Sequence, residues 1–160
     1  MNELNFRVAN FMKMVSMFMV LGALLYFYAY VGDRLDFVPS SDEGSIDHVS
    51  KSVVFYSGLG IFAVFNLVIN AVLSVYKSAE KYHESSVLLK SEIHKERVML
   101  WIVYLIVGVN TSIASAITYL ALLRINNVSG DSAYVYVLIF GLVIVAATFI
   151  GLLAAVFKRA

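Results

Sequence analysis

The stretch Ser132–Phe157, SAYVYVLIFGLVIVAATFIGLLAAVF, contains no Asp, Glu, Lys, Arg or His. A helix that crosses the hydrocarbon core of a bilayer needs about 20 apolar residues, and this stretch is long enough. Three further stretches also lack charge: Met14–Gly32, Ser52–Tyr76 and Val98–Leu123. We therefore expect four transmembrane helices, over residues 12–32, 52–77, 98–123 and 132–157.

The composition agrees with a membrane protein. Of the 160 residues 61% are hydrophobic, and the mean hydropathy is +0.83, whereas a soluble domain is about 45–50% apolar. The net charge of +1 gives no basic surface for nucleic acid, and the chain has no cysteine for a disulfide, a thiolate metal site or a catalytic thiol. The expected fold class is an all-α membrane protein with a single domain, residues 1–160, embedded in the lipid bilayer.

The basic residues predict how this domain is oriented. Lys and Arg are enriched on the cytoplasmic side of membrane proteins. Most of the 12 lie at one set of helix ends, namely Arg7, Lys13, Lys77, Lys81, Lys90, Lys95, Arg97, Lys158 and Arg159. We therefore expect a four-helix transmembrane bundle with both termini in the cytoplasm. Its first helix is a retained anchor, because its apolar run is longer than that of a signal peptide and ends in the bulky rings of LLYFYAYVG.

Two loops separate the first three predicted helices. The outer loop, residues 33–51, is acidic, with Asp33, Asp36, Asp42, Glu43 and Asp47. The cytoplasmic connection, residues 78–97, has mixed charge and neither Gly nor Pro. It is expected to extend the second and third helices beyond the membrane as a helical hairpin that turns near Ser85–Ser86.

The sequence contains little that predicts chemistry. Glu80-x-x-His83 is one half of a carboxylate-bridged metal motif, but the second copy that such sites require is missing. The four charge-free stretches contain no Asp, Glu, Lys, Arg or His that could relay protons or ions. The three histidines, His48, His83 and His94, all lie outside these stretches. We therefore expect no catalytic residues, no metal, no cofactor and no enzymatic activity.

Asparagines supply the strongest polar signal within the apolar stretches. Asn66, Asn70 and Ser74 form one stripe at helical spacing in the second span. Counted from the inner ends of their antiparallel spans, Asn66 and Asn110 lie at nearly the same depth, so these two amides are expected to face each other. Asn70 has no amide at its depth on the third span. The stripe either fastens helices together, the favoured interpretation, or lines a functional cavity.

Small residues predict close helix contacts in the last two spans. Spacings of four residues link Gly108, Ser112 and Ala116 in the third span, and Ala147, Gly151 and Ala155 in the fourth. Gly108 and Ala147 match in depth, but the remaining residues of the two stripes run apart. The inner half of the fourth span is therefore expected to meet the first span or a helix of another protein.

The outer loop and the start of the second span carry Pro39, Gly44, Asp47 and Ser50-Lys51 in that order. With the first span, this arrangement resembles the DUF1648/SdpI-like bacterial membrane domain, although Ser41 and Glu43 stand where that family has His and Asn. The resemblance covers about a third of the chain. It implies a protein of the bacterial cytoplasmic (inner) membrane with a non-enzymatic role.

These observations favour a structural or accessory subunit of a larger membrane protein complex, with other integral membrane subunits as partners. Two alternatives remain open. One is a sensor or immunity-type protein that acts through the acidic outer loop. The other is a small channel or carrier lined by Asn66, Asn70, Ser74 and Asn110.

Overall fold

The computed structural model describes residues 3–32, 34–36, 48–79, 91–125 and 132–157. In chain order the elements are α1 (Glu3–Tyr30), β1 (Arg34–Asp36), β2 (His48–Ser50), α2 (Lys51–Ser78), α3 (Glu92–Ile125) and α4 (Ser132–Phe157). All four helices are long and apolar enough to cross a membrane. Helix α4 has the predicted bounds, and α2 is longer than predicted by one residue at each end.

Helices α1 and α3 begin before the apolar stretches that predict them. Helix α3 starts at Glu92, so part of the connection between α2 and α3 is helical, while the predicted turn at Ser85–Ser86 lies outside the described residues. Helix α1 starts at Glu3, and it therefore contains Arg7 and Lys13. The charge pattern predicts these two residues as a flank before the apolar part of the first span, and the structure shows that this flank is helical.

A short ribbon connects α1 to α2. Strands β1 and β2 pair antiparallel, with Arg34 opposite Ser50 and Asp36 opposite His48. Immediately after the ribbon, the Ser50 hydroxyl accepts a hydrogen bond from the backbone N–H of Val53 and caps the start of α2. The ribbon was not expected from the sequence, and residues 37–47 of the acidic loop lie outside the described part of the chain.

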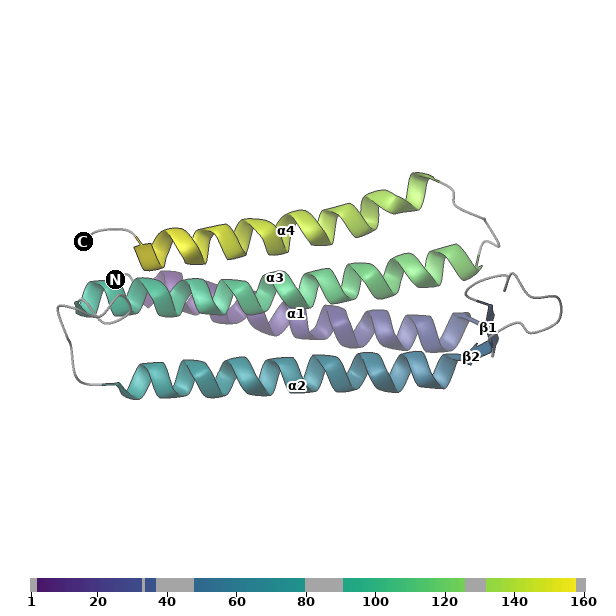
Figure 1. Cartoon of the computed structure of the whole chain (residues 1–160), viewed down its shortest axis with the longest axis horizontal. Coiled ribbons are helices and arrows are strands. Elements are labelled where there is room, and N and C mark those ends of the chain that lie inside the picture. The colour runs from purple at the N-terminus through teal and green to yellow at the C-terminus, as the bar shows by residue number, and fades with distance from the viewer. Residues whose placement is uncertain (1–2, 33, 37–47, 80–90, 126–131, 158–160) are drawn as a thin grey trace.

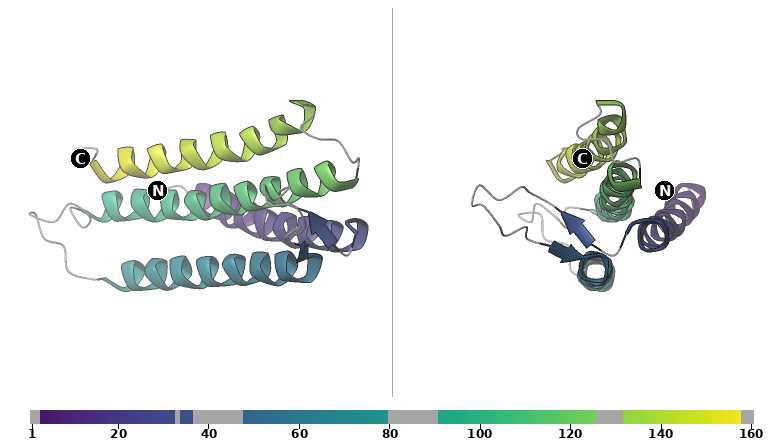
Figure 2. Two further views of the ribbon diagram at one scale, coloured as in Figure 1. Left: turned by 45° about the vertical axis from the view of Figure 1, so that its right-hand side comes forward. Right: turned by 90° about the vertical axis from the view of Figure 1, so that its right-hand side faces the viewer.

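Helix α3 is the centre of the arrangement. It packs against α1, α2 and α4, whereas α4 packs chiefly against α3 alone. Figure 1 shows α2 and α4 on opposite sides of α3, and the end-on view of Figure 2 shows the same order. The predicted bundle is thus an open arrangement around α3, in which α4 depends on a single seam for its position.

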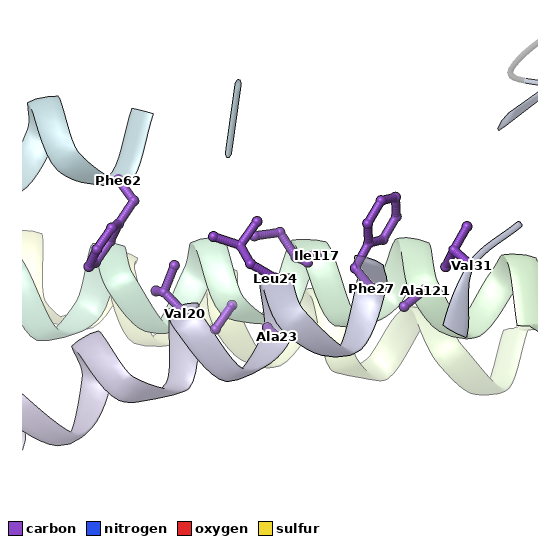
Figure 3. Close-up of a cluster of buried hydrophobic side chains, with 9 residues drawn as sticks. Val20, Ala23, Leu24, Phe27, Val31, Phe62, Ile117 and Ala121 are labelled. Atoms are coloured by element: carbon purple, nitrogen blue, oxygen red, sulfur yellow. The ribbon is translucent and has the colours of Figure 1, made fainter. Parts of the chain in front are cut away.

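The apolar core lies where α1, α2 and α3 converge, in the half of the molecule nearest the ribbon (Figure 3). Helix α1 contributes a helical stripe to this core, and α2 and α3 pack onto it. The buried residues are Val20, Ala23, Leu24, Phe27, Val31, Phe62, Ala114, Ile117 and Ala121.

At the ribbon end, aromatic contacts also join α1 to α2. The Tyr28 and Phe55 ring centres are 5.0 Å apart, and the Lys51 ammonium lies 5.0 Å from the centre of the Tyr28 ring. Toward its N-terminus, α1 is inclined away from α2, as the end-on view of Figure 2 shows. In that half the Lys13 ammonium reaches across from α1 to the side-chain oxygen of Asn70 on α2.

Candidate functional site

Two buried asparagines join α2 to α3. Asn66 is 5% exposed and Asn110 is 0% exposed. The Asn66 side-chain nitrogen donates to the Asn110 side-chain oxygen at 2.9 Å, and the Asn110 side-chain nitrogen donates in return to the Asn66 side-chain oxygen at 3.3 Å. The two amides, expected from their depth to face each other, thus form a reciprocal pair.

Ser16 brings α1 into the same cluster. Its hydroxyl, 1% exposed, accepts from the Asn110 nitrogen at 3.3 Å and donates to the Lys13 carbonyl at 2.8 Å. The Asn66 nitrogen also donates to the Phe62 carbonyl at 2.8 Å. Because each amide nitrogen carries two N–H groups, all four donors of the pair have acceptors within the protein. We call Ser16, Asn66 and Asn110 the polar junction.

Lys13 supplies the partner that Asn70 lacks on α3. The Asn70 nitrogen donates to the Asn66 carbonyl at 2.6 Å, and its side-chain oxygen accepts a hydrogen bond from the Lys13 ammonium. Both side chains are half-buried. Counting charge-free residues could not reveal this contact, because Lys13 lies just outside the apolar stretch even though α1 extends well beyond it.

The polar stripe of α2 ends at Asn70. Ser74 is exposed, and its carbonyl oxygen accepts from the Ser78 hydroxyl at 3.1 Å within the same helix. Ser74, predicted as the third member of the stripe, therefore lies outside the cluster. Ser16 takes that third place, and no sequence motif marks it. Its spacing from Ala9, Val20 and Phe27 along the buried face of α1 is the one signal that could have found it.

Three glycines bring α3 and α4 into close contact. A Cβ atom on Gly108 would lie 2.2 Å from the Thr148 hydroxyl oxygen, and one on Gly151 would lie 2.0 Å from the Trp101 ring. On Gly141 it would lie 2.9 Å from the Ser112 Cα atom. All three distances are shorter than real Cβ contacts, so only glycine fits at these positions in this packing.

The predicted partner of Gly108 is wrong by one residue. Ala147 is exposed, and Thr148 lies against Gly108 in its place. Matching depths finds the correct level, but neighbouring residues differ by about 100° around a helix. The seam on α4 repeats every seven residues through Gly141, Thr148 and Ala155, a spacing that could have identified Gly141 and Thr148.

The inner half of α4 also differs from expectation. Gly151 meets Trp101 and Ala155 is buried, so this half packs on α3 rather than on α1. On α3, the backbone at Ser112 meets Gly141, and Ala116 is half-buried. Of the six small residues predicted to pack, five are at least half-buried, whereas Ala147 is exposed.

A buried lysine caps the C-terminal end of α2. The Lys95 ammonium donates to the Lys77 carbonyl at 2.8 Å and to the Ala79 carbonyl at 2.5 Å. Carbonyls in the last turn of a helix lack intrahelical partners, so a cation placed there satisfies them. Neighbouring His94 is buried, and no group of three potential metal ligands occurs among the described residues; Glu80 and His83 lie outside them.

Replacing Lys95 with methionine is expected to fray the last turn of α2. Methionine keeps much of the apolar stem but removes both hydrogen bonds to the carbonyls. Backbone amides near Lys77 and Ser78 should then exchange with solvent deuterium faster than in the parent protein, while those near Asn66 stay protected. The exposed Lys77→Met variant is the matched control, and equal exchange in both variants would contradict this capping role.

An apolar groove of about 530 Å³ lies between α1, α3 and α4. Its walls include Met19, Gly22, Tyr26, Thr118 and Phe140. The residues that line it include no Asp, Glu, His, Lys or Arg. The groove is therefore a largely apolar surface.

The residues behind the family resemblance are placed only in part. Ser50 and Lys51 open α2, whereas Pro39, Gly44 and Asp47 lie outside the described residues. Comparison with protein-family models, with curated proteins and with solved structures finds no match to this chain.

Proposed function

We propose that this chain is a non-enzymatic, multi-pass protein of the bacterial inner membrane that serves as a structural or accessory subunit of a larger membrane protein complex. Both termini face the cytoplasm in this proposal. Its support is the length and apolar character of the four helices, together with the enrichment of Lys and Arg at one set of helix ends.

The main support for the proposal is that the amide N–H groups of the polar junction all find acceptors within the protein. Asn66 and Asn110 use all four of their amide N–H groups on each other, on Ser16 and on the Phe62 carbonyl. No donor of this pair is left for a ligand. An interhelical polar contact in lipid contributes about 0.6–2 kcal/mol, which is enough to select the rotation and register of three helices.

The outer helices offer surfaces to a partner. Helix α3 is the most covered of the four, and α2 and α4 are the least covered. Large apolar side chains project from α4 away from the seam, among them Phe140, Phe149 and Ile150. Lipid or a second membrane protein can cover such a surface, and the proposal assigns part of it to the second protein.

Recovery of a partner tests the proposal. The tagged full-length chain, crosslinked in native membranes and purified in mild detergent, should bring down one integral membrane protein in fixed stoichiometry. An unrelated four-span protein with the same tag controls for adhesion to apolar surfaces. If the chain migrates alone as a monodisperse monomer both with and without crosslinking, the accessory role is wrong.

A small channel or carrier is the second candidate, because Lys13 and Asn70 continue the polar contacts beyond the junction. It predicts solute flux into liposomes that disappears in the Asn66→Leu variant, whereas the accessory role predicts no flux with either protein. The sensor alternative depends on a loop of which residues 37–47 are not described, and it stays a prediction. Replacing that loop should then abolish activity while insertion persists.

A further inference from the structure

Lys13 is the charged group that the polar junction does not explain. Within the described part of the chain, its ammonium has one hydrogen-bond acceptor, the side-chain oxygen of Asn70. An ammonium has three N–H donors and a full positive charge, and a neutral amide satisfies one donor without balancing the charge. Glu92 and Glu96, whose side chains are described, lie at the start of α3.

Hydrogen bonds set the level of Lys13 relative to the other helices. Ser16 bonds to Asn110, which bonds to Asn66, so these three residues share one level. At a rise of 1.5 Å per residue, Lys13 lies about 4.5 Å and Asn70 about 6 Å toward the inner end. Glu96 lies about 21 Å from Asn110 along α3 toward the same end, and therefore about 16 Å beyond Lys13 along the axis, too far to balance the Lys13 charge.

In the proposed membrane orientation, this level lies inside the hydrocarbon. Asn110 is near the middle of the third span, and the hydrocarbon half-thickness is about 15 Å. A lysine deep in a bilayer costs about 2.5–3.5 kcal/mol on insertion scales, and such residues pair with other groups or mark functional sites. Because Asn70 holds the ammonium at this level, the phosphate of a lipid headgroup lies roughly 10 Å or more beyond it.

The surface beside this lysine can accept a helix. Exposed residues form a stripe at helical spacing on α2 beside Asn70, namely Leu67, Ala71 and Ser74. Ala71 and Ser74 are small, so a neighbouring backbone can approach closely. The N-terminal half of α1 is inclined away from α2, as Figure 2 shows, and the exposure of the stripe means that no described part of the chain covers it.

We propose that Lys13 and Asn70 form the docking point for a transmembrane helix of the partner subunit that carries one Asp or Glu near its middle. The carboxylate accepts hydrogen bonds from the lysine ammonium and neutralises its charge, while Asn70 keeps the ammonium in place. This inference rests on the proposed accessory function and specifies the chemistry of the partner.

A synthetic helix can test this chemistry without knowledge of the partner. The full-length protein and a polyleucine transmembrane peptide are reconstituted in vesicles of zwitterionic lipid, and association is measured by energy transfer. The peptide carries Asp four residues from its centre on the cytoplasmic side, and two otherwise identical control peptides carry Asn or Leu at that position. We expect the Asp peptide to bind about tenfold more tightly than the Leu peptide, a difference of about 1.4 kcal/mol.

Variants of the protein separate charge from hydrogen bonding. Lys13→Gln should abolish the preference for Asp, Lys13→Arg should retain it, and the exposed Lys77→Gln control should leave it unchanged. Equal binding of the Asp and Asn peptides would overturn the proposal, since an amide would then suffice. So would loss of the Asp preference when anionic lipid is added, since a lipid phosphate would then occupy the lysine.

Comparing partner recovery by the wild-type protein and by Lys13→Gln tests the lysine docking point separately from the accessory function. If wild-type protein and Lys13→Gln bring down the same partner in equal amounts, the accessory role stands and the lysine docking point is wrong. If the partner is lost only from Lys13→Gln, both hold. If neither protein recovers a partner, the accessory function itself fails.

Discussion

Replacing Gly141 with leucine is expected to separate α4 from α3. A Cβ atom at this position meets the Ser112 Cα atom and the Ser115 side chain within 3 Å, so a change of rotamer cannot relieve the clash. Overpacking of a close contact costs about 1–3 kcal/mol. Because α4 packs chiefly against α3, no second contact of similar size holds it in place.

The single tryptophan provides the measurement. Trp101 packs against Gly151 at the same seam, so its fluorescence reports on the contact between α3 and α4. In Gly141→Leu, quenching of Trp101 by brominated lipid should rise clearly above that of the parent protein. Gly22→Leu and Gly60→Leu are matched controls, since nothing lies within 4 Å of a Cβ atom at either position. Equal quenching in all four proteins would show that the seam is misplaced.

Replacing Asn110 with leucine is expected to destabilise the junction of α1, α2 and α3. The change removes the reciprocal amide pair and the bond to Ser16 at a position with no exposed surface. Asn66 keeps its bond to the Phe62 carbonyl but loses the partner of its side-chain oxygen. A buried polar group left without its partner costs about 1–3 kcal/mol.

Reversible unfolding in mixed micelles with increasing SDS measures this loss. Thr111→Val is the matched control, because Thr111 is a buried neighbour whose hydroxyl donates to the Val107 carbonyl of its own helix and, among the described residues, to no other helix. Its loss of stability should be clearly smaller than that of Asn110→Leu. A loss of equal size would mean that any polar residue removed from this part of α3 has the same effect.

Charge and depth were sufficient to predict the helices and the amide pair. A run of apolar residues has few stable structures in lipid other than a helix, so each charge-free stretch predicts one element. Counting 1.5 Å per residue from the inner ends then brings Asn66 and Asn110 to one level. The depth of a residue along its helix follows from its position in the sequence alone. The contact between these two residues can therefore be predicted without knowing how the helices are rotated.

Rotation and helix ends were harder to predict. Thr148 rather than Ala147 meets Gly108 because rotation depends on the whole seam, including the close approach of Gly141 to the Ser112 backbone. The start of α1 could not be found from charge alone, because a helix can continue through Arg7 and Lys13. This extension places Lys13, which comes directly before the charge-free stretch, beside Asn70.

A double-mutant cycle between Asn66→Leu and Asn110→Leu tests most directly whether the buried amides fasten helices together. With both amides replaced, neither leaves the other without a partner, so the double variant should lose less stability than the two single variants combined. We expect a coupling free energy of about 0.6–2 kcal/mol in SDS unfolding of the full-length protein. Strictly additive losses would contradict the account, because they would show that Asn66 and Asn110 do not depend on each other.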